Sequence, residues 1–98
     1  MARLMRLLYK LTRRELEIVP VMNTYPHCNA NMLSELLCVT KSCVYGHCSR
    51  IYAKLRVANK LEMLLWCREN ELVSGLEEFI PDCARRRAEE LGIVSRSL

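Results

Sequence analysis

The sequence predicts an all-α fold, and three observations point to it. The first is composition: the 98 residues include only three glycines and three prolines, with 51% hydrophobic and 27% charged residues. This balance argues against both a disordered chain and a β-sandwich. The second is that apolar residues recur at helical spacing, and the third is a series of side chains suited to capping helix N-termini. The length allows a single domain.

The N-terminal part predicts a short helical extension followed by a capped helix. Leucines recur at helical spacing, which places the extension over residues 1–10. Thr12 and Glu15 then match a capping box, in which each side chain accepts the other residue's amide hydrogen. Pro20 lacks an N–H and should kink or shorten this helix, leaving a loop over residues 23–28. The apolar side chains that the helix should bury are Leu16, Ile18, Val19 and Met22.

Asn29 and Thr40 are the next capping residues, and each precedes a run with helical apolar spacing. Asn29 predicts a short helix over residues 30–37, and Thr40 predicts a longer one over residues 41–55. Only a tight connection at residues 38–39 separates them. The short helix should bury Leu33, Leu36 and Leu37. The longer helix should bury Val44, Cys48, Ile51 and Leu55, and its opposite face carries Lys41, Ser42, Tyr45, Gly46, Ser49 and Arg50.

A fourth helix is predicted from about residue 59 to about residue 70. It is apolar on more than one side, which a single small core cannot satisfy, so another segment or a second subunit should cover it. Residues 71–98 are expected to form a helical C-terminal extension. Within it, Pro81 suits a helix first turn and Gly92 suits a stop after Leu91.

Charge is unevenly distributed along the chain, whose net charge is +4. Residues 1–14 and residues 38–60 each carry five basic groups and no acid, whereas the segments between and after them are acidic. Two such blocks suggest a surface that faces a polyanion, with nucleic acid the first candidate and an anionic membrane the second. On charge alone, however, ordinary solvated side chains are the preferred interpretation. The basic residues of the second block are Lys41, Arg50, Lys54, Arg56 and Lys60.

The six cysteines are interpreted first as small hydrophobic residues. No secretory signal precedes them, and no apolar run reaches the roughly 18 residues that span a bilayer. His47 and Cys43 have the spacing of metal ligands on one helix face, but no C-x-x-C pair accompanies them. We therefore expect no metal and no cofactor. A redox switch is an alternative, through Cys28 or Cys43, which the pattern predicts to be the least buried thiols.

Two helices joined by a tight turn, the second longer and basic on its exposed face, are typical of a helix-turn-helix. The residues around this pair resemble the DNA-binding domain of the LuxR/GerE family. Residues 11–19, LTRRELEIV, resemble its L-T-x-R-E-x-E-V-L opening, and residues 37–40 resemble its L-x-I-S turn. Residues 44–57 resemble its V-x-x-H-x-x-x-I-x-x-K-L-x-V recognition helix, and residues 59–62 resemble its N-R-x-E. The resemblance covers about residues 11–70.

The chain departs from the family pattern at several points. The loop after the first helix is two residues longer, and Pro20 falls within that helix. Cys43 stands where the family usually has Thr, and Tyr45 where Lys or another polar residue is common. Gly46 in mid-helix costs about 1 kcal/mol of helix propensity. These changes bear on base preference rather than on fold.

The resemblance implies a four-helix domain over residues 11–70, with helical extensions over residues 1–10 and 71–98. It further implies a sequence-specific transcriptional regulator of the bacterial cytoplasm, acting on double-stranded DNA as a homodimer. RNA polymerase or another regulator is a further candidate partner, and no membrane is expected. The expected DNA-binding residues are Lys41, Ser42, Tyr45, Gly46, Ser49, Arg50, Lys54 and Lys60. Of these, Lys54 and Lys60 should contact backbone phosphates only. The expected dimer interface comprises Leu61, Leu64, Leu65 and Trp66.

A second interpretation belongs to a different class of function. The domain could be a protein-interaction module that keeps the fold and modulates another transcription regulator without binding DNA. Tyr45 and Gly46 on the recognition face and the acidic C-terminal third favour it. Enzymatic activity is not expected, because no nucleophile and base fall together in a cleft that this sequence could form.

Overall fold

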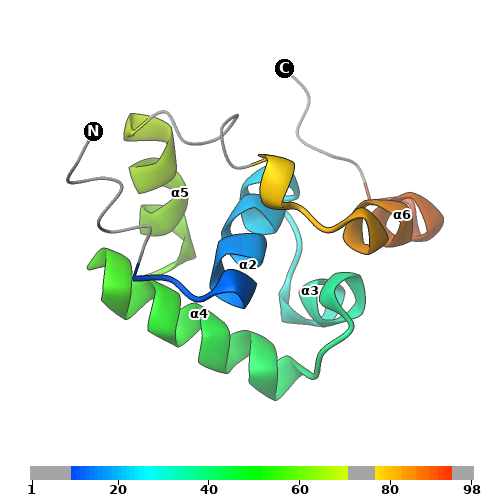
Figure 1. The fold of residues 1–98 in the computed structure, drawn as a ribbon, viewed down its shortest axis with the longest axis horizontal. Coiled ribbons are helices and arrows are strands. Elements are labelled where there is room, and N and C mark those ends of the chain that lie inside the picture. The colour runs from blue at the N-terminus through cyan, green and yellow to red at the C-terminus, as the bar shows by residue number, and fades with distance from the viewer. Residues whose placement is uncertain (1–9, 71–76, 94–98) are drawn as a thin grey trace.

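The computed structural model describes residues 10–70 and 77–93. Within these ranges the chain forms five α-helices, one 3-10 turn and no strand, so the all-α prediction is confirmed for this part (Figure 1). The predicted helix within residues 1–10 falls almost wholly outside the described residues. The elements are α2 (Arg13–Thr24), α3 (Ala30–Leu37), α4 (Lys41–Leu55), α5 (Lys60–Glu69), the 3-10 turn η1 (Glu77–Phe79) and α6 (Asp82–Leu91).

The predicted capping residues begin the helices in the structure. Thr12 Oγ1 accepts the Glu15 amide hydrogen at 3.2 Å, and the Thr12 amide donates to Glu15 Oε1 at 2.9 Å, which completes the capping box of α2. Asn29, Thr40 and Asn59 each accept an amide hydrogen three residues later, so they satisfy a backbone donor at the start of α3, α4 and α5. Gly92, in the left-handed region, ends α6.

The expectation that Pro20 shortens the first helix is wrong. α2 continues through Pro20 to Thr24, so the first two residues of the predicted loop are helical. Pro20 removes one backbone hydrogen bond, but it lies within a fully buried run over residues 18–23. Asn23 in that run also donates its side-chain N–H to Val19 O at 2.9 Å. Packing of this turn therefore outweighs the missing N–H.

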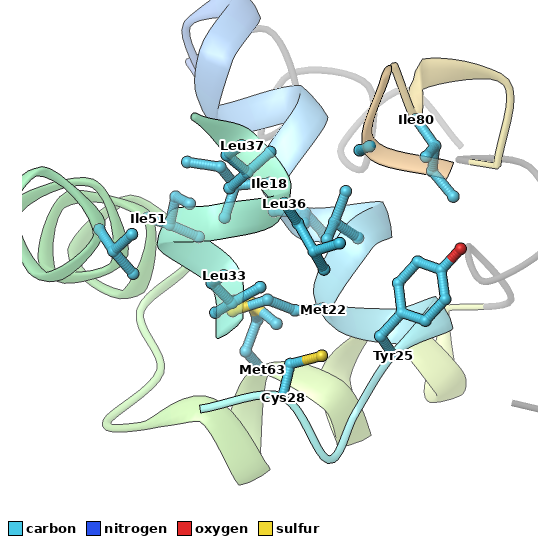
Figure 2. Close-up of a cluster of buried hydrophobic side chains, with 14 of the residues drawn as sticks. Ile18, Met22, Tyr25, Cys28, Leu33, Leu36, Leu37, Ile51, Met63 and Ile80 are labelled. Carbon is cyan, nitrogen blue, oxygen red and sulfur yellow. The ribbon is translucent and has the colours of Figure 1, made fainter. Parts of the chain in front are cut away.

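The core lies between α2, α3, α4 and α5, and α2 is its most deeply buried helix (Figure 2). The predicted burial of the three leucines of α3 is confirmed, as is that of Ile18, Val19 and Met22 in α2. Leu16 and Cys48, also expected inside, are only half-buried. α6 adds Ala84 and Ala88 to the same core by packing against α3.

The arrangement leaves one side of α4 uncovered by the other described elements. In Figure 1, α4 runs along the lower edge of the molecule, and α2, α3 and α5 all lie on its upper side. α6 packs on α3 at the opposite end of the molecule from α5, so this part of the C-terminal extension does not cover α5. Every described helix is too short or too polar to span a bilayer.

Candidate nucleic-acid interface

A three-residue turn, Cys38 to Thr40, sets the direction of α4 relative to α3. Cys38 adopts the left-handed conformation with φ 55°, which costs a non-glycine residue about 1 kcal/mol. The amides of Cys38 and Val39 both donate to Ser34 O, which closes the C-terminus of α3 within the turn. α4 then starts at once on the Thr40 cap. Figure 1 shows α3 almost end-on and α4 lengthwise, so the two helices cross steeply.

The uncovered face of α4 carries the side chains that the sequence placed there. Tyr45 is 62% exposed, and Gly46 is half-buried. The face contains no acidic residue, and its opposite side is anchored by the buried Val44, Ile51 and Leu55. The outward-facing exposed residues are Lys41, Ser42, Tyr45, Ser49 and Arg50.

A buried carboxylate beneath α4 engages two of its basic residues. Glu15 is 0% exposed, and Lys54 Nζ donates to its Oε1 at 2.6 Å. Arg50 Nε lies 3.7 Å from the other oxygen. Burial raises the pKa of Glu15, but the Lys54 hydrogen bond, the Thr12 amide and the two positive charges together hold it below its ordinary value. Glu15 therefore stays ionised and attaches α4 to the start of α2.

Lys60 is also engaged within the protein. Its ammonium donates to Pro26 O at 2.7 Å and to Cys28 O at 2.8 Å, which connects the start of α5 to the loop after α2. The structure thus places Lys54 and Lys60, expected at phosphates, in internal contacts spanning more than 30 residues of sequence. No local pattern in the sequence signals contacts of this range.

Arg50 has partners within the protein, whereas Arg56 forms no ion pair among the described residues. The Arg50 guanidinium lies 3.1 Å from His47 Nδ1 and also faces Glu15, although its side chain is 57% exposed. Arg56 follows α4 in the left-handed conformation with φ 60° and is exposed. Lys41 at the other end of α4 is exposed as well. Among the described residues, neither Lys41 nor Arg56 forms an ion pair.

The residues expected at a dimer interface fall into two groups. Leu61 is 66% exposed and Leu65 is 45% exposed, so two large apolar side chains of α5 face away from the core. Leu64 and Trp66 are half-buried and pack against it. Met63 and Cys67, on the other apolar side of α5, are fully buried in the core.

The thiols divide by burial, and the expectation for Cys28 is wrong. Cys28 is 2% exposed because the loop folds inward, its amide donating to Tyr25 O and its carbonyl accepting from Lys60. Cys43 is exposed as expected. Burial raises the pKa of the thiols of Cys28, Cys48 and Cys67. Across the described residues, no group of three or more His, Cys, Asp or Glu side chains could hold a metal ion.

Comparisons of the chain with protein-family models, with curated proteins and with solved structures each found no match.

Proposed function

We propose that this protein is a sequence-specific DNA-binding regulator of transcription in a bacterial cytoplasm, acting as a homodimer with α4 as its recognition helix. The observation that carries this proposal is the uncovered, acid-free face of α4, set by a three-residue turn after α3. A single α-helix fits the major groove of B-DNA, where each base pair presents a distinct pattern of donors and acceptors. The LuxR/GerE-like sequence blocks over residues 11–70 support the same function.

In this pose the middle of α4 approaches the base edges. Tyr45 and Ser49 supply hydroxyl groups there, and Gly46 lets the helix backbone come close. Arg50 reaches a guanine or a phosphate by leaving His47, at a modest cost because its side chain is already 57% exposed. Ser42, in the exposed first turn of α4, lies near the sugar-phosphate backbone of the DNA in this pose.

We assign the contacts to DNA phosphates to Lys41 and Arg56. Lys41 and Arg56 lie at opposite ends of α4, exposed and without an ion pair among the described residues. Lys54 would have to leave Glu15 in order to bind a phosphate, and Lys60 already uses two of its three N–H donors within the protein. We therefore assign them chiefly to holding α4 and α5 in place.

The second copy of the chain is proposed to pack on α5. Leu61 and Leu65 present apolar surface that the described residues leave uncovered. A twofold axis at α5 would set two copies of α4 against successive major-groove faces, as in other dimeric helix-turn-helix proteins.

A protein-interaction module is the second candidate function. It is favoured by the hydrogen bonds that Lys54 and Lys60 make within the protein, because these leave fewer cations for DNA than the sequence predicted. On this account Tyr45, Leu61 and Leu65 are exposed anchors for another regulator.

A gel-shift titration of the full chain against genomic fragments separates the two candidates. DNA binding predicts that Lys41→Ala and Arg56→Ala each weaken binding to all sequences and flatten the salt slope by about one. Arg87→Ala is the matched control, because Arg87 is an exposed arginine on α6 that pairs with Glu90. Absence of a shift with folded protein at low salt would contradict the DNA-binding proposal.

A further inference from the structure

A pocket of about 400 Å³ opens between α3, α4 and the loop that precedes α3. Its walls are mostly apolar, and they include Tyr45, Cys48 and Tyr52 from α4 and Cys28 from the loop. A volume of this size and a predominantly apolar lining with few polar groups are the usual features of a small-molecule site. The wall residues on which the argument depends are Met22, Leu33, Val44, Tyr45, Cys48 and Tyr52.

Among the described residues that line this pocket, Lys60 alone is charged. An ammonium group carries three N–H donors, and two of these bind the neutral carbonyls of Pro26 and Cys28. Among the described residues, no carboxylate pairs with Lys60. The third donor of Lys60 is thus left for an anion that enters this apolar cavity, where the interaction would be stronger than in water.

We propose that this pocket binds a small aromatic carboxylate. The ring packs between Met22, Leu33 and the two tyrosines, because aromatic rings pair favourably with other rings and with sulfur. The carboxylate accepts the third N–H of Lys60. A neutral ring of the same shape leaves the Lys60 charge unpaired, and a cationic one is repelled.

The pocket shares two residues with the proposed DNA face. Tyr45 and Ser49 line the pocket and also lie on the outward side of α4. A ligand in the pocket therefore contacts side chains proposed to approach base edges and alters their conformation. This regulatory consequence rests on the proposed function, whereas binding of the carboxylate does not.

The test is a titration of the ¹⁵N-labelled full chain with benzoate and with benzamide, its neutral counterpart, followed by amide chemical shifts. We expect saturable benzoate shifts around residues 28–33, 44–52 and 60, with benzamide binding about tenfold more weakly. A tenfold difference corresponds to about 1.4 kcal/mol, close to the lower end of the range for hydrogen bonds to charged groups. Equal affinities for the two compounds, no saturation, or shifts centred elsewhere would overturn the proposal.

Two variants and a control locate the site. Lys60→Gln should remove the preference for benzoate, whereas Lys41→Gln, which deletes an exposed cation outside the pocket, should keep it. Because Lys60 also anchors the loop, Ala30→Leu provides an independent test by filling the pocket from α3 without altering the charge. A folded Ala30→Leu protein that binds benzoate as well as the wild type contradicts the assignment. If benzoate binds but no DNA does, the pocket stands and the proposed function fails.

Discussion

At the scale of single residues, Glu15 connects the candidate DNA-binding helix α4 to the start of α2. It is fully buried and contacts the Thr12 amide on its own helix and Lys54 on α4. A buried ion is costly unless it is paired, so removing one partner leaves the others unsatisfied. Glu15 is thus a positioning residue for α4 rather than a contact to DNA.

Glu15→Gln should lower the free energy of unfolding at neutral pH by about 1–3 kcal/mol, because Lys54 loses its charged acceptor. Glu17→Gln is the matched control, since Glu17 makes only a surface ion pair with Arg14 and should change stability by less than about 1 kcal/mol. Urea unfolding measures both.

The same pair of proteins tests the pKa of Glu15. Because the folded-state pKa lies below the ordinary 4.5, the stabilisation is fully present above pH 4.5. It is lost as the pH falls through the lower folded-state pKa. The stability gap between wild type and Glu15→Gln should therefore close in acid, and a gap that persists well below that range would refute the assignment.

The six thiols should react in two classes. Cys38, Cys43 and Cys83 are exposed and should be alkylated rapidly by iodoacetamide in the native protein. Cys28, Cys48 and Cys67 should react slowly, because burial both shields these thiols and raises their pKa. Mass spectrometry of tryptic peptides after short labelling gives the order in which the cysteines are alkylated. Early modification of Cys28 would contradict the burial of its loop.

At the scale of elements, local chemistry was enough to predict α3 and α4 to the residue. Their caps, their apolar spacing and the turn between them all lie within a few residues of one another. The sequence could not show that Pro20 stays inside α2 or that Cys28 is buried, because packing against distant segments decides both. The internal contacts of Lys54 and Lys60 could not be predicted for a related reason: their partners, Glu15 and Pro26, lie 39 and 34 residues away.

Gly46, in the middle of α4, lowers the intrinsic helix propensity of this segment. A Cβ at Gly46 would meet only the Arg50 guanidinium, at 3.5 Å, which is an ordinary contact. Gly46→Ala should therefore raise the free energy of unfolding by about 0.5–1 kcal/mol. Gly92→Ala should have the opposite sign, because φ at Gly92 is +71°. If Gly46→Ala destabilised the protein, our description of α4 would be wrong.

At the scale of the whole molecule, the two candidate surfaces are carried by different helices, with association assigned to α5 and DNA binding to α4. This separation allows association and DNA binding to be disturbed independently. Leu61→Glu should abolish self-association with little loss of monomer stability, because Leu61 is 66% exposed. Leu91→Glu, at an exposed leucine of α6, is the control.

Sedimentation velocity on the free protein and on its DNA complex measures this effect. We expect wild type and Leu91→Glu to form dimers on DNA, and Leu61→Glu to remain monomeric at the same concentration. A wild-type protein that is monomeric both free and on DNA would show that α5 does not join two copies.

The central claim is that α4 reads DNA sequence, and selection of binding sites from a random duplex pool tests it most directly. The wild-type protein should enrich a twofold-symmetric sequence whose half-sites are one helical turn or a multiple of it apart. Tyr45→Ala and Arg50→Ala should change the preferred bases within each half-site, whereas Arg87→Ala should select the wild-type sequence. Failure of the folded wild-type protein to enrich any sequence, or identical sequences from all four proteins, would contradict the claim.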